Sequence, residues 1–278
     1  MVTMELGSAL LATLRYWREC GIDRLSGEDY GWGGANPFIR MPARQYPSQR
    51  VLSSPPVVQV PQTPSEPTVA VEPPPVVSLD RLLTPVVPLS ERAPLFQQWS
   101  DQVAQCRACP LSVTRQQTVY GSGAKDATAV WIADAPSALD EQTRQPLGGE
   151  TRELVTGMIR AAGWQRDQVY VTYVVKCRPP GDRNPKSDEI RLCQTYWIQE
   201  LETIRPRIIV ALGKVAVETL LGPVGQLATI RGQLHSWRGI PVIPLYHPAY
   251  CLRTPLAKRA VWEDLIKLIK FMHNQGFC

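Results

Sequence analysis

The sequence of 278 residues has no apolar run long enough to cross a bilayer, and no cluster of basic residues at its amino terminus. The opening segment carries Glu5 instead, so it matches a secretory signal peptide poorly. Between Met41 and Ala93 lysine is absent and apolar periodicity is lost, while prolines recur. We therefore expect a cytoplasmic protein without a membrane anchor, and an extended proline-rich tether at 41–93.

The length of the chain indicates its domain organisation, and the distribution of charge shows which part is basic. One domain usually needs about 100–200 residues, so we expect one domain plus extra sequence. We predict a helical segment at 1–40, the tether at 41–93 and a folded domain at 94–278. The formal charge is +5, from 30 Lys and Arg against 25 Asp and Glu, and the basic excess lies after residue 100. Such a domain permits contact with nucleic acid, although a solvated basic face is the commoner explanation.

Strand-like and helix-like patterns alternate from Ala93 onward. Apolar runs predict buried strands at 129–134, 168–175, 207–213 and 240–245. Amphipathic patterns predict a helix near 95–103 and others at 150–162, 187–204, 214–221 and 258–272. This order predicts an α/β domain with a central parallel four-stranded sheet flanked by helices. Ligands of such sheets bind at the carboxyl ends of the strands, so we expect functional loops after Asp134, Val175, Gly213 and Leu245.

Four of the seven cysteines form a pattern. Cys106 and Cys109 make a C-x-x-C pair, and Cys177 and Cys193 flank a basic, proline-rich loop. Disulfides are not expected in a reducing compartment. Four thiolates suit either a zinc ion or a [4Fe-4S] cluster, and spacing alone does not separate these. Buried free cysteines are a simpler explanation for the second pair, but the polar turn around the first pair has no apolar face to fill. The pattern therefore favours metal.

Four further segments run in order through the domain: ADAPSALDEQTRQPLGG, VTYVVKCRPPGDRNP, IIVALG and YHPAYCLR. Together with the four cysteines they resemble the iron–sulfur uracil-DNA glycosylases known as family 4, over about Leu95 to Met272. The resemblance implies the fold of those enzymes and a [4Fe-4S] cluster on Cys106, Cys109, Cys177 and Cys193. A shared fold does not by itself establish a shared activity.

The resemblance also assigns four residues to a base pocket: Asp134, Leu147, Tyr173 and His247. Uracil excision needs a flipped base, hydrogen bonds that read its edge, and stabilisation of the departing anion. Asp134 is one methylene shorter than the acid of the family, and His247 is retained. Leu147 replaces an aromatic whose stacking is worth about 1–3 kcal/mol, and Tyr173 replaces the amide that reads the base. We therefore predict a vestigial pocket with no catalytic residue.

Simpler roles fit the remaining polar residues. An aspartate after a strand is commonly a turn or helix-cap residue, and a histidine before proline is often structural. Basic residues near the expected loops fit phosphate contact and solvated charge equally well. The candidates for DNA contact are Arg178, Arg183, Lys186 and Arg253, with Lys258 and Arg259 further along.

The amino-terminal segment carries aromatic and aliphatic residues at helical spacing. We predict that Trp17, Ile22, Leu25, Tyr30 and Trp32 bind a partner, although packing of this helix on the α/β domain fits equally well. The stretch YWRECGIDRL and the closing AKRAVWEDLIKLI resemble psi subunits of the bacterial DNA polymerase III clamp loader, in their longer form. That resemblance implies binding to the clamp-loader collar (tau/gamma subunits), to the chi subunit, and through chi to single-stranded-DNA-binding protein.

These patterns lead to one functional hypothesis with two alternatives. The hypothesis is a noncatalytic, psi-like replisome subunit that bridges the clamp loader to chi. The first alternative is a divergent family 4 uracil-DNA glycosylase in base-excision repair, which uses Asp134 and His247. The second alternative is a cluster-bearing DNA-binding protein with neither role.

Overall fold

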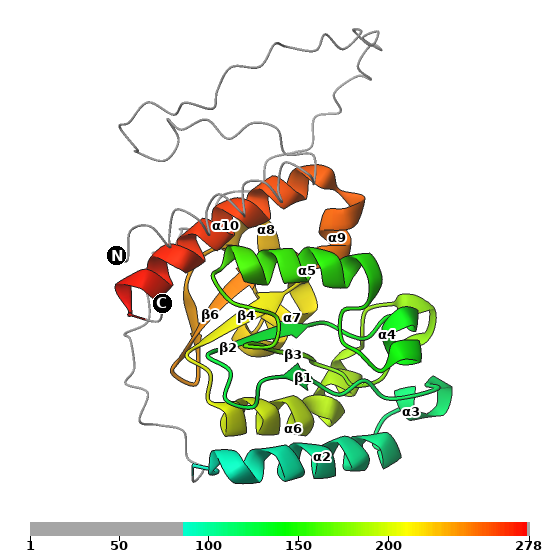
Figure 1. The fold of residues 1–278 in the computed structure, drawn as a ribbon. Helices are drawn as coiled ribbons and strands as arrows, with labels where there is room; N and C mark the ends of the chain where they lie inside the picture. The colour runs from blue at the N-terminus through cyan, green and yellow to red at the C-terminus, as the bar shows by residue number, and fades with distance from the viewer. Residues whose placement is uncertain (1–85, 277–278) are drawn as a thin grey trace, which may run out of the picture. The chain divides into compact units, whose positions relative to one another are not determined.

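A six-stranded sheet in the order β1-β3-β2-β4-β6-β5 organises residues 86–276, the part of the chain that the computed structural model describes (Figure 1). The central strands are parallel: β3 (Tyr170–Tyr173), β2 (Ala129–Ala133), β4 (Ile208–Leu212) and β6 (Ile240–Leu245). Antiparallel edges are added by β1 (Ser122–Gly123) and β5 (His235–Trp237). The predicted parallel sheet is confirmed. The edge strands were missed because two or three residues are too few to show a periodic pattern.

Helices cover both faces of the sheet, which explains why every residue of β2, β3 and β4 is buried. The face that presents Val130 and Ile132 packs against α2 (Leu89–Gln105), α6 (Ser187–Ile204) and α7 (Lys214–Leu221). The opposite face is covered by α5 (Gly149–Ala161), α9 (Pro248–Arg253) and α10 (Pro255–Asn274) (Figure 1). The predicted helices 187–204 and 214–221 agree with α6 and α7, and α10 begins three residues before its predicted start.

The short elements lie in the loops between strands and helices. They are α3 (Leu111–Thr114), α4 (Ala138–Thr143), the 3-10 turn η3 (Pro180–Asp182) and α8 (Leu227–Ile230). α3 follows the C-x-x-C pair, and α4 follows β2. Because such loops carry the side chains at the strand ends, their position determines the site.

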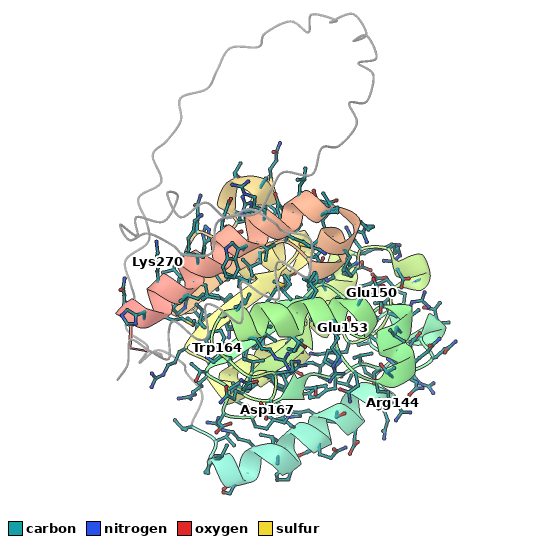
Figure 2. The ribbon with its side chains drawn as sticks, turned by 45° about the horizontal axis from the view of Figure 1, so that its top comes forward. Arg144, Glu150, Glu153, Trp164, Asp167 and Lys270 are labelled. Carbon is teal, nitrogen blue, oxygen red and sulfur yellow. The ribbon has the colours of Figure 1, made fainter. Side chains whose placement is uncertain are left out.

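The amphipathic α5 fixes the loop that precedes it. Glu150 and Glu153 are exposed on this helix (Figure 2), while Leu154 and Met158 are buried. Burial of each apolar side chain contributes roughly 1.5–3 kcal/mol relative to exposure. Beyond the helix the chain turns through Gly163, at φ 89°, to the buried Trp164. The anchored helix holds residues 144–149 against the carboxyl end of the sheet.

Two sequence predictions concern membranes and the amino-terminal segment. None of the helices within residues 86–276 has the length and apolar character needed to span a bilayer. The predicted partner-binding residues Trp17, Ile22, Leu25, Tyr30 and Trp32 lie outside the described residues.

Candidate active site

Asp134 directly follows β2 and binds the start of α7. Its Oδ1 accepts a hydrogen bond from the Ala216 amide at 2.7 Å, in the first turn of that helix. Gly213, at φ 96°, leaves room for the carboxyl, because a Cβ there would lie 2.7 Å from Asp134 Oδ2. Burial raises the pKa of Asp134 to about 7. The residue is therefore a helix cap, and its carboxyl group changes charge near neutral pH.

His247 follows β6 and caps α9. Its Nδ1 accepts a hydrogen bond from the Ala249 amide at 3.2 Å. Burial and the nearby positive charge of Arg253 lower the pKa of His247 to about 4. A neutral imidazole that accepts at Nδ1 carries its hydrogen at Nε2. His247 therefore presents an N–H donor at neutral pH.

Tyr173 ends β3 and is held by the loop between α4 and α5. Its hydroxyl donates to Asp140 Oδ2 at 2.8 Å and accepts from the Leu147 amide at 2.7 Å. The Tyr173 side chain is 1% exposed, and Leu147 is buried in the left-handed region at φ 57°. Burial and the nearby Asp140 carboxylate keep the pKa of Tyr173 well above its usual range. The hydroxyl therefore has both a donor and an acceptor within the protein.

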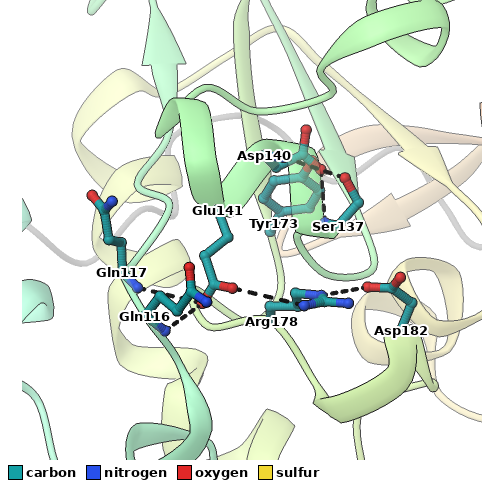
Figure 3. Close-up of polar contacts among 8 residues, drawn as sticks. All are labelled: Gln116, Gln117, Ser137, Asp140, Glu141, Tyr173, Arg178 and Asp182. Carbon is teal, nitrogen blue, oxygen red and sulfur yellow. Dashed lines mark hydrogen bonds and ion pairs between the residues drawn. The ribbon is translucent and has the colours of Figure 1, made fainter.

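Asp140 is a site residue that the sequence analysis missed. Besides Tyr173, its carboxylate accepts a hydrogen bond from the Ser137 amide at 2.8 Å (Figure 3). It also accepts one from the Gly148 amide at 2.5 Å. Ser137 in turn caps α4 by accepting from the Asp140 amide at 3.3 Å. The Ser137-x-x-Asp140 spacing is that of a capping box, which is a signal that the sequence contains.

Two of the four candidates for DNA contact are engaged within the protein. Arg178 donates to Asp182 at 2.6 Å and lies 3.9 Å from the buried Glu141, as Figure 3 shows. Arg183 donates hydrogen bonds to both carboxylate oxygens of Glu189, at 2.6 and 2.9 Å. The other two candidates, Lys186 and Arg253, are exposed, and neither forms an ion pair with a carboxylate among residues 86–276.

The four patterned cysteines come together beside the pocket. Cys177 and Cys193 are buried with Leu111 and Val175, and Cys109 packs against them. Cys106 and Cys109 lie close enough to influence the pKa of Cys177. Burial raises the pKa of Cys109 and Cys177, and that of Cys193 to about 12. These three thiols are thus protonated at neutral pH and would lose protons on binding a metal. We call these four residues the cysteine corner.

A buried ion pair lies beneath the cysteine corner, on the face of the sheet that α6 covers. Lys176 Nζ contacts Glu200 Oε2 at 2.7 Å, and both side chains are fully buried. Thr172 donates to Glu200 Oε2 at 2.6 Å, and Tyr170 donates to Glu200 Oε1 at 2.9 Å. Successive side chains of a strand point to opposite faces, so Thr172 joins this pair while Tyr173 points into the pocket.

Two cavities lie near the end of α2. One of about 490 Å³ runs between α2 and residues 115–125, and another of about 650 Å³ lies at the end of α2. Neither is lined by Asp134, Leu147, Tyr173 or His247. The side chain of Tyr173 itself is 1% exposed and is therefore enclosed by the protein.

Comparison with known proteins agrees with this arrangement. The family model described as Uracil DNA glycosylase superfamily matches residues 120–266, just over half of the chain. The chain belongs to this superfamily. The type-4 uracil-DNA glycosylase of Thermotoga maritima is 35% identical over 189 residues, which cover 66% of this chain and 98% of that protein. Those of Sulfurisphaera tokodaii and Saccharolobus solfataricus are 34% and 33% identical, over 62% and 61% of this chain and 83% and 82% of theirs.

These relatives correct the predicted function. We predicted a noncatalytic subunit of the DNA polymerase III clamp loader, with the collar, chi and single-stranded-DNA-binding protein as partners. The relatives are instead named as glycosylases at 31–35% identity, so this prediction is wrong and an enzyme is the better interpretation. The error came from the short amino-terminal match and from the weight given to Leu147 and Tyr173. The resemblance to family 4 is upheld, and that to psi subunits finds no support.

Proposed function

We propose that this protein is a DNA glycosylase that releases uracil from DNA. The observation that carries the proposal is the match to a type-4 uracil-DNA glycosylase along 98% of that protein's length. The strand ends also hold a carboxyl group with a pKa of about 7, at Asp134, and a neutral imidazole at His247. Uracil leaves deoxyribose as an anion, so a catalyst must stabilise negative charge on the base and positive charge on the sugar.

The two groups suit these two charges. His247 donates a hydrogen bond from Nε2 to the departing base, and the neutral imidazole stabilises the developing anion without transferring a proton to it. Asp134 supplies a carboxylate above pH 7, which stabilises the sugar cation or accepts a proton from attacking water. The hydrogen bond from Ala216 fixes the orientation of that carboxylate. Activity should accordingly rise as the pH increases through about 7.

Tyr173 limits how the base is bound. Its hydroxyl already pairs with Asp140 and the Leu147 amide, so a base that uses those groups must displace it. Leu147 presents an aliphatic side chain rather than a ring for stacking. We therefore expect slow excision, with binding energy drawn mainly from the DNA backbone. Contacts of this kind suit the exposed Lys186 and Arg253.

The cysteine corner suits a [4Fe-4S] cluster held by Cys106, Cys109, Cys177 and Cys193. Four thiols with N–H donors around them match the donor set of such clusters. Among residues 86–276 no group of three or more His, Cys, Asp or Glu side chains is placed to hold a metal ion, so the four thiols would have to move closer together when a cluster binds. When bound, a cluster supplies cross-links between distant segments and a redox centre. The cysteines hold α2, β3 and α6 together around it.

The test is release of uracil from single- and double-stranded oligonucleotides by the purified full-length protein. We compare the wild type with His247→Asn and Asp134→Asn. Loss of one stabilising donor typically lowers the rate about 10²–10³-fold. Matched controls are His273→Asn and Asp167→Asn, because both residues are exposed and lie on the last turn of α10 and in the loop before β3. These should keep wild-type rates.

The proposal has a clear failing outcome. If the wild-type protein leaves uracil in both substrates at every pH between 6 and 9, the proposed function is wrong. If excision is unchanged in both His247→Asn and Asp134→Asn, other residues carry out the catalysis.

A further inference from the structure

Arg115 contacts the cysteine corner through its side chain. It directly follows α3 and is half-buried. Its Nη1 donates to Cys177 Sγ at 3.2 Å, while Nη2 donates to the carbonyl oxygens of Ala104 at 3.0 Å and Cys106 at 2.6 Å. One guanidinium therefore joins the segment carrying the first two cysteines to the segment carrying the third.

The two carbonyl contacts have a physical reason. Ala104 lies in the last turn of α2, and Cys106 is the C-cap residue that directly follows this helix. Carbonyl groups at a helix carboxyl end lack partners within the helix, and a positive charge there is favourable. α2 has no basic residue of its own in its last turn. Arg115 therefore serves as the missing cation for α2 and fixes the direction in which the chain enters the C-x-x-C turn.

The contact with Cys177 differs from those made to the other sulfur atoms. Cys106 accepts from the Ala108 amide at 3.5 Å, and Cys193 accepts from the Lys176 amide at 3.3 Å. The Cys109 sulfur accepts hydrogen bonds from the backbone amides of Leu111 and Ser112. Those donors belong to the backbone, Cys106 has a further hydrogen bond with the Tyr196 side chain, and none of these groups carries a positive charge. Arg115 brings a full positive charge to a thiolate, and such charge-assisted hydrogen bonds are about twice as strong as neutral ones.

We propose that Arg115 is the positioning residue of the cluster site. Its planar fork holds the Cys106 and Cys177 segments at the spacing that the cluster needs, and its charge offsets the negative charge of the bound thiolates. Hydrogen bonds and charge at the sulfur atoms set both the retention and the reduction potential of iron–sulfur clusters. The inference rests on the proposed cluster but not on the proposed uracil excision.

Two substitutions separate the fork from the charge. Arg115→Gln removes both, whereas Arg115→Lys keeps the charge but lacks the planar fork that spans a sulfur and two carbonyls. The control is Arg107→Gln, because Arg107 lies between Cys106 and Cys109 and is exposed. It removes the same charge from the same turn without a hydrogen bond to a sulfur.

The measurements are made on anaerobically purified full-length protein. They are iron and acid-labile sulfide per chain, the rate of iron loss to a chelator, and the midpoint potential of the cluster. Arg115→Gln should lose iron about 10- to 100-fold faster than the wild type and have a more negative potential. Arg115→Lys should also lose iron faster, with a potential near that of the wild type. Arg107→Gln should match the wild type in both.

Several outcomes overturn the inference. Equal iron retention in the wild type and both Arg115 variants would show that the guanidinium does not position the site. If Arg107→Gln changed iron loss and midpoint potential as much as Arg115→Gln does, positive charge near the site would explain the effect and the contacts of Arg115 would not. If Arg115→Gln does not fold, the chelator rate of Arg115→Lys decides the matter. Wild-type protein without metal removes both the cluster and the inference, whereas iron-loaded protein without uracil release leaves the inference standing.

Discussion

The cysteine corner and the base pocket lie side by side at the carboxyl ends of β2 and β3. They differ in whether their polar side chains are already paired within the protein. The four thiols in the cysteine corner are surrounded by N–H donors, so they are arranged to receive something that the protein itself does not supply. In the pocket, the Tyr173 hydroxyl and the Asp140 carboxylate already satisfy one another. Asp134 is likewise satisfied by α7.

This difference indicates which region needs a ligand in order to be stable. A buried polar group without a partner costs about 1–3 kcal/mol, and the pocket avoids that cost by internal pairing. The cysteine corner keeps three raised thiol pKa values until a metal displaces their protons. We therefore expect the fold to depend strongly on the cysteine corner and only modestly on the pocket.

The largest effect is expected from Cys177→Ser in the cysteine corner. Loss of a cluster that links distant segments should lower the free energy of unfolding by several kcal/mol, of the order seen for structural metal sites. Cys251→Ser is the control, because Cys251 is equally buried but lies outside the cysteine corner. The measurement is iron content together with the thermal midpoint. Equal midpoints for the two variants would contradict a stabilising cluster.

The next effect concerns the ion pair beneath the cysteine corner. Glu200→Gln leaves the Lys176 ammonium buried without its counter-ion, and breaking such a pair typically costs about 3–5 kcal/mol. Glu202→Gln on the same helix is the control, because its pair with Arg238 is partly exposed and worth about 1 kcal/mol at most. Urea unfolding distinguishes the two. Similar midpoints would mean that water or rearrangement relieves the buried charge.

Asp134→Asn tests the pocket through pH. The folded-state pKa of Asp134, about 7, exceeds its ordinary 3.8, so the protonated form is favoured by folding. The stability that this provides is complete below pH 4 and is lost as the pH rises through 7. Asparagine keeps the acceptor for Ala216 without the charge. The stability of the variant relative to the wild type should therefore increase as the pH rises from about 4 to about 7, by at most about 4 kcal/mol. A pH-independent difference in urea unfolding would contradict the raised pKa.

Tyr173→Phe should have the smallest effect on stability. It removes one hydroxyl, which leaves the Leu147 amide without its partner and takes one of three hydrogen-bond donors from the Asp140 carboxylate, at a cost of about 1–3 kcal/mol. The freed groups should at the same time increase uracil excision relative to the wild type. Tyr250→Phe is the control, because Tyr250 is 41% exposed on α9. Thermal unfolding and base release are measured together. Lower stability with unchanged excision would show that Tyr173 is structural only.

Much of the fold was predictable because its strands and longer helices carry strong patterns. α6 and α7 were predicted to the residue, since each is amphipathic and flanked by helix-ending signals. The pocket was less predictable because its contacts depend on loop conformation. Leucine rarely adopts a positive φ, so nothing in the sequence indicated that the Leu147 amide would reach Tyr173. The Lys176 and Glu200 side chains meet across 24 positions, which no local pattern records.

The strand order has a consequence for assembly during synthesis. β1, β2 and β3 form one half of the sheet and are made first, while β4, β5 and β6 form the other half and follow. All four cysteines precede β4, so the set of thiols is complete before the second half of the sheet has left the ribosome. Metal could thus be inserted into a nascent chain, and the half that carries His247 would then add onto a preassembled edge. Ribosome-bound chains that end after α6 should therefore already acquire iron.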